Sequence, residues 1–123
     1  MGFPVSRAVC ALVFVASTMM TSSVLAHAHL TQPIPAADSV VSAPQAITLN
    51  FSEGIEPGFS GVVVTDAQKQ VIKTGTATRD DKNKAQLTVP LEHALASGTY
   101  RVDWHVVSVD GHKTKGSYRF SVK

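Results

Sequence analysis

Two short polar segments near opposite ends of the chain contain residue types that bind metal ions. Residues 27–29 read His-Ala-His, and residues 110–112 read Asp-Gly-His. Imidazole nitrogens and carboxylate oxygens are common ligands of divalent metals. In an extended chain, Asp110 and His112 project from the same face about 7 Å apart, and Gly111 between them permits a sharp turn. Each segment is therefore a candidate half of a metal site.

The first segment gains a further donor if the chain is cut directly before His27. Residues 1–26 have the form of a secretory signal, with Arg7 as the positive region, an apolar stretch at residues 8–16 and a small-residue cleavage site at residues 24–26. Cleavage would leave His27 with a free α-amine, and the amine and imidazole of one residue can chelate a single ion. We therefore expect a signal over residues 1–26 and one mature domain over residues 27–123.

Together the two segments offer three nitrogen donors and one oxygen donor. The donors are the amine and imidazole of His27, the carboxylate of Asp110 and the imidazole of His112. Such a set suits copper(II), nickel(II) or zinc, with the affinity order favouring copper(II), and differs from the all-oxygen sites of calcium and magnesium. An Asp-x-His spacing is common by chance, so its weight comes from its coincidence with a histidine at the cleavage point.

His29 offers a competing mode of binding. A free amine followed by a histidine at the third position can bind copper(II) or nickel(II) through two deprotonated backbone amides, without help from the fold. That mode requires a terminus without strand pairing, whereas Leu30 and Thr31 are expected to enter the first strand. His27 is therefore the preferred ligand, and a contribution from His29 stays open.

Composition excludes several other chemistries. Cys10 and the three methionines all lie within residues 1–26, so the expected mature chain contains no sulfur. Disulfides, thiolate zinc sites, iron–sulfur clusters, cysteine nucleophiles and thioether copper(I) sites are thereby ruled out.

The charge balance and the apolar segments bound the partners of the domain. After removal of Arg7, lysine and arginine outnumber aspartate and glutamate by one, and no basic stripe with interleaved aromatics accompanies them. Nucleic acid is therefore not an expected partner. The apolar run of the signal is shorter than the roughly 20 residues that cross a bilayer, so we expect a soluble exported domain.

The elements that must position these residues are β-strands, because apolar and polar residues alternate through most of the mature chain. The residues expected on inward faces are Ile47, Leu49, Phe51, Ala85, Leu87, Val89, Tyr100, Val102, Trp104, Val106, Tyr118, Phe120 and Val122. Further strands are expected at residues 28–32, 61–65 and 70–74, a hairpin tip at residues 79–84, and at most a turn or two of helix at residues 91–96. His105, on the opposite face from Trp104, and His93 are expected in solvent.

About seven short strands separated by proline and glycine turns predict an all-β domain. The predicted architecture is an immunoglobulin-like seven-stranded Greek-key β-sandwich or a small barrel, since strand periodicity does not separate the two.

Several segments carry a resemblance to a known family. These are the terminus from His27 to Leu30 and residues 35–39, 51–54, 98–100 and 102–112. The chain resembles the periplasmic copper-resistance protein C (CopC) family, in particular its short YobA-like members, through essentially the whole mature sequence.

The resemblance implies a Greek-key β-sandwich or barrel in the periplasm that binds copper(II) through His27, Asp110 and His112. It also implies that Glu53 hydrogen-bonds an imidazole and orients it. An inner-membrane copper transporter of the copper-resistance D (CopD) type is the expected partner. Some relatives have a methionine-rich stretch for copper(I), but residues 64–78 contain no methionine. We therefore expect a single copper(II) site per chain, in a monomer.

Two other functions remain open. The first is an enzyme that uses a histidine brace for oxidative copper chemistry, which needs an open position for oxygen that Asp110 would occupy. The second is a metal-free sandwich module that binds a protein partner, which would leave the histidine at the cleavage point a coincidence. We expect a non-catalytic protein that sequesters or carries copper.

Overall fold

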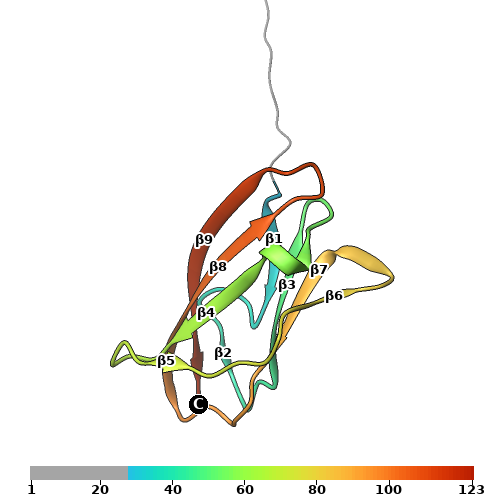
Figure 1. Ribbon diagram of the computed structural model, residues 1–123. Coiled ribbons are helices and arrows are strands. Elements are labelled where there is room, and N and C mark those ends of the chain that lie inside the picture. Colours follow the sequence, from blue (N-terminus) through green and yellow to red (C-terminus); the bar gives the residue numbers. More distant parts are fainter. Residues whose placement is uncertain (1–27) are drawn as a thin grey trace, which may run out of the picture.

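The computed structural model describes residues 28–123, which form two β-sheets packed face to face (Figure 1). The four-stranded sheet has the order β1 (Leu30–Ile34), β3 (Ala46–Phe51), β7 (Asn83–Pro90) and β6 (Thr78–Asp80). The five-stranded sheet has the order β2 (Val40–Val41), β9 (Lys113–Val122), β8 (Gly98–Val107), β4 (Gly61–Thr65) and β5 (Val71–Ile72). All neighbouring strands are antiparallel except β2 and β9. The predicted all-β sandwich is confirmed.

The inward faces follow the predicted alternation. Buried side chains include Ile47, Leu49, Leu87, Val102, Trp104 and Phe120. Trp104 packs edge-on against Phe51, with ring centroids 5.3 Å apart. Opposite Trp104 on β9 is Gly116, where a Cβ atom would lie 2.6 Å from the indole Cζ2 atom. Only a glycine therefore lets the indole ring lie across the neighbouring strand.

Two local elements between the long strands differ from the expectation. The helical turn predicted at residues 91–96 is wrong: the amide of Leu91 donates to the carbonyl of Gln45, and Leu91 forms an isolated bridge with Thr74. These contacts hold the chain extended where it leaves β7. A 3₁₀ turn, η1 (Pro57–Phe59), occurs instead between β3 and β4.

Two short strands, β2 and β6, were also not expected. Their pairing comes from distant partners, with β2 against residues 121–122 and β6 against β7. Strands of two or three residues have too little sequence for a period to be visible. No helix among residues 28–123 is long and apolar enough to cross a membrane.

The two ends of the described chain lie at opposite ends of the sandwich. Figure 1 shows the start of β1 beside the turn that joins β8 to β9, whereas the carboxyl terminus lies at the far end. Segments from the beginning and the end of the sequence therefore meet at one rim.

Candidate metal centre

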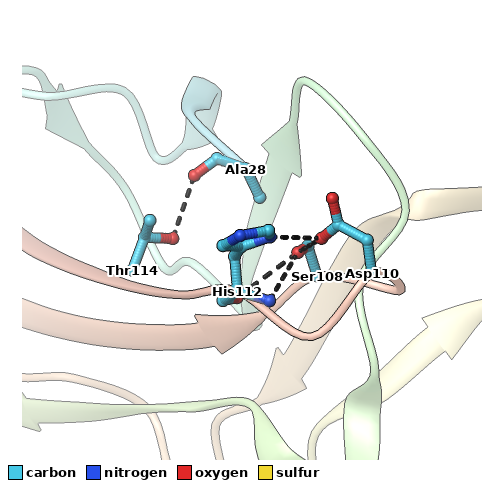
Figure 2. Close-up of polar contacts among 5 residues, drawn as sticks. All are labelled: Ala28, Ser108, Asp110, His112 and Thr114. Atoms are coloured by element: carbon cyan, nitrogen blue, oxygen red, sulfur yellow. Dashed lines mark hydrogen bonds and ion pairs between the residues drawn. The ribbon is translucent and has the colours of Figure 1, made fainter. Parts of the chain in front are cut away.

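The turn between β8 and β9 brings Asp110 and His112 together. Its backbone is closed by hydrogen bonds from the Ser108 amide to the His112 carbonyl (2.9 Å) and from the Gly111 amide to the Ser108 carbonyl (2.8 Å). Gly111 has a φ angle of +91°, in the region that favours glycine. The Oδ1 atom of Asp110 lies 3.0 Å from Nδ1 of His112 (Figure 2). Both side chains are about half exposed, at 42% and 49%, so an ion from solvent can reach them.

Ser108 forms the floor of this turn and was not singled out by the sequence analysis. The residue is fully buried, and its hydroxyl donates to Oδ1 of Asp110 and accepts the amide N–H of His112 at 3.2 Å. The sequence does indicate that Ser108 is buried, since position 108 continues the alternation by which residues 100, 102, 104 and 106 point inward. The hydrogen bond from Ser108, and after it the one from His112, lowers the pKa of Asp110 below its ordinary value of 3.8. Asp110 is therefore a carboxylate throughout the neutral range.

The first described residue is fixed beside the turn. Ala28 is 1% exposed, and its carbonyl accepts a hydrogen bond of 3.0 Å from Oγ1 of Thr114, which lies two residues beyond His112 on β9 (Figure 2). His27 itself lies outside the described residues. Its role as a ligand therefore stays a prediction.

The backbone of His29 is engaged in a way that opposes the competing mode. Its amide N–H donates to Oγ of Ser52 at 2.8 Å, and its carbonyl accepts the Ser52 amide at 2.8 Å. In the competing mode that same amide would have to lose its proton and bind the metal. Binding through His29 would therefore require the hydrogen bond from its amide to Ser52 to break.

The segment that contains Glu53 runs alongside the turn. The amide of Val109 donates to the carbonyl of Gly54 at 3.0 Å, and a Cβ atom on Gly54 would lie 3.2 Å from Cγ1 of Val109. Glu53 is half-buried next to this contact. Its predicted role in orienting an imidazole stays a prediction.

Within residues 28–123, no three His, Cys, Asp or Glu side chains gather closely enough to hold a metal ion. The Asp110–His112 pair supplies two of the four predicted donors, and the other two belong to His27. The remaining histidines, His93 and His105, are exposed on other parts of the surface, as predicted.

Comparisons with known proteins identify relatives of this chain. The CopC domain model matches residues 30–123. Protein YobA of Escherichia coli strain K12 is 59% identical over 114 residues, covering 92% of each chain. Copper resistance protein C of Escherichia coli is 38% identical over 108 residues, covering 82% of this chain and 85% of the relative.

Among solved structures, PcoC, a methionine-rich copper resistance protein from Escherichia coli, superposes with a TM-score of 0.72. It shares 36% sequence identity, and the match covers 80% of this chain and all of that one.

Proposed function

This chain belongs to the CopC domain family, and on that premise we propose that it is a non-catalytic protein that binds copper(II) and sequesters or carries it. One ion per chain would be bound by the amine and imidazole of His27, the carboxylate of Asp110 and the imidazole of His112. The proposal includes export to the periplasm with removal of residues 1–26, and delivery to an inner-membrane transporter of the CopD type.

The observation that carries the proposal is the hydrogen bond between Thr114 and Ala28. Neighbouring Cα atoms in a chain are about 3.8 Å apart. A terminal histidine joined to Ala28 therefore has one residue of chain with which to reach a turn that ends two residues before Thr114. The reach fits a chelate that is shared between the two ends of the sequence.

The two carboxylate oxygens of Asp110 have different contacts, which suits two different roles. Its Oδ1 atom receives the contacts from Ser108 and His112, whereas Oδ2 makes no hydrogen bond or ion pair within residues 28–123. We assign Oδ2 to the ion and Oδ1 to the orientation of His112, whose Nε2 atom would then bind copper. Ligating histidines commonly donate their other ring nitrogen to a carboxylate in this way.

The same arrangement favours binding over oxidative catalysis. A carboxylate beside His112 would fill the position that oxygen needs in a histidine-brace enzyme. A hard oxygen ligand also favours copper(II) over the softer copper(I) that such chemistry uses. The relatives named as copper resistance proteins agree with this assignment.

Electron paramagnetic resonance of copper(II) tests the proposal. The processed chain, beginning at His27, should give one signal with couplings from three nitrogens at one equivalent of copper. His112→Ala should remove one nitrogen from that pattern, because the variant lacks an imidazole of the site. His93→Ala removes an exposed histidine outside the turn and should leave the spectrum unchanged. Identical spectra for all three proteins would contradict the assigned ligands.

Ser108→Ala should weaken copper(II) binding by about 10- to 100-fold, the loss usual when a group that orients a metal ligand is removed. Without the hydroxyl, Asp110 loses the hydrogen bond that fixes its carboxylate, and its pKa should rise toward the ordinary value. Competitive titration against a chelator measures the affinity, and carboxyl NMR signals report the pKa of Asp110.

The matched control is Ser117→Ala, which removes an exposed serine from the outer face of β9 and should bind copper as the parent does. Melting curves of both variants identify any loss of folding. A folded Ser108→Ala protein with the parent affinity would rule out this role for the hydroxyl.

A further inference from the structure

A groove of about 580 Å³ lies on the outer face of the five-stranded sheet, directly beside the turn of Asp110 and His112. Its walls include Phe59 of η1, His105 and Val107 of β8, and Lys113 and Lys115 of β9. Lys113 follows His112 in the chain. The groove and the candidate metal centre thus share the β8–β9 hairpin.

The groove is rigidly built on the apolar side. The hydroxyl of Ser60 accepts the amide of Val107 at 3.1 Å, and the amide of Glu56 donates to the carbonyl of Val107 at 2.7 Å. These two bonds tie both ends of η1 to β8. Phe59 therefore lies in a fixed backbone turn at the edge of the groove, with 73% of its surface exposed. An aromatic ring fixed in water at the edge of a recess is typical of a contact surface.

The floor of the groove depends on a glycine. His105 lies opposite Gly61 of β4, and a Cβ atom on Gly61 would lie 3.3 Å from Cε1 of the imidazole. Because Gly61 has no side chain, the ring can lie against the neighbouring strand. The recess between this ring and Phe59 therefore stays open to a side chain from outside.

The rim of the groove is cationic. Lys113 and Lys115 are exposed, and within the described residues neither ammonium group has a carboxylate within ion-pair distance. Asp103 is the one acidic residue among the outward positions of β4, β8 and β9, and it is bound to Arg101 at 3.0 Å. Since the mature chain as a whole is nearly neutral, positive charge is concentrated on this face.

We propose that this groove docks an acidic segment of a partner protein. An apolar side chain of the partner would enter between Phe59 and Val107, and flanking carboxylates would pair with Lys113 and Lys115. The docked partner would then lie beside Asp110 and His112, where it could exchange copper. Docking itself does not depend on the proposed copper site.

The chemistry of the groove disfavours other occupants. An anionic membrane could take up the exposed ring of Phe59 but would leave the recess beside it unfilled, whereas a side chain of a peptide can enter that recess. A second copy of the chain would bring the lysines of one protomer against those of the other, and like charges at an interface are unfavourable.

Selection of displayed random peptides on the metal-free processed chain tests the proposal without knowledge of the partner. Enriched sequences should contain a large apolar residue flanked by at least two acidic residues. A synthetic peptide of that sequence should shift the NMR signals of Phe59, His105, Lys113 and Lys115. Its affinity should fall about tenfold or more in a Lys113→Gln, Lys115→Gln double variant, and also with added salt.

The matched control is the double variant Lys82→Gln, Lys84→Gln, which makes the same charge change at the exposed β6–β7 turn of the other sheet. It should bind the peptide as the parent does. Phe59→Ser should reduce affinity without any change of charge.

Three results would overturn the proposal: enriched peptides without acidic residues, signals that shift elsewhere on the protein, or equal binding by both double variants. Binding to phosphatidylglycerol vesicles that depends on Phe59, in place of peptide binding, would assign the face to a membrane. Concentration-dependent dimers that Phe59→Ser abolishes would assign it to a second copy. A parent chain that binds the peptide but not copper(II) would contradict the proposed function and leave the docking surface intact.

Discussion

Lowering the pH from 7.5 to 5 should weaken copper(II) binding by several orders of magnitude, because nitrogen ligands must be free of their protons before they coordinate a metal. Coordination by the proposed site requires two imidazoles and one α-amine in their neutral forms. Protons compete with the ion for these three nitrogens, so the loss of affinity should grow as the pH falls.

Asp110 should contribute nothing to this loss. The hydrogen bond from Ser108, and then that from His112, lowers its pKa below 3.8, so the carboxylate stays charged down to pH 5. A site built mainly of carboxylates would lose much less affinity over the same range. The size of the change in copper affinity with pH therefore indicates how many nitrogen ligands bind the ion.

Competitive titrations at pH 7.5, 6.5, 5.5 and 5.0, with a chelator whose own protonation is known, measure the effect. Far-ultraviolet circular dichroism at each pH verifies that the sandwich stays folded. A change of less than tenfold over the whole range would exclude the amine and both imidazoles as a joint ligand set.

Acetylating the α-amine of His27 should weaken copper(II) binding by more than about 100-fold. The acetyl group turns the terminal amine into an amide with no free amine beside it, so this nitrogen no longer binds the ion and the chelate of His27 is broken. The loss should exceed the 10- to 100-fold effects usual for groups that only orient a ligand. The paramagnetic resonance spectrum should lose one nitrogen as well.

Amidation of the carboxyl terminus at Lys123 is the matched control, since Figure 1 places that terminus at the far end of the sandwich. That chain should bind copper as the parent does. Equal affinities for the acetylated chain and the amidated chain would exclude the amine from the site.

Much of the fold could be predicted because alternation reflects burial directly. The alternation predicted that four side chains of β8 point inward, and all four are buried: Tyr100, Val102, Trp104 and Val106. The strands β2 and β6 were not readable, because their few residues are extended only through pairing with β9 and β7. The segment at residues 91–96 has a helical composition, but Leu91 is bonded to other segments and residues 92–93 form a bend, so no helical turn begins there.

The geometry of the turn that contains Asp110 and His112 was predictable in part for a similar reason. The spacing of Asp110 and His112 placed two donors on one turn, and the structure has them 3.0 Å apart. The hydrogen bond from Ser108 to Asp110 was not predicted, because a serine at the end of a strand does not by itself indicate which group its hydroxyl contacts. The groove at Phe59 was missed because its wall and its rim are more than fifty positions apart in the sequence, and only the fold brings them together.

The hydrogen bond between Ala28 and Thr114 joins residues 86 positions apart, so it closes nearly the whole domain into a ring. A copper ion bound by both His27 and His112 would add a second cross-link between the same two segments, at the beginning of the edge strand β1. Closing a long ring costs the unfolded chain much of its freedom. Peeling of β1, the natural first step of attack by a protease at this end, would then have to wait until the ion departs.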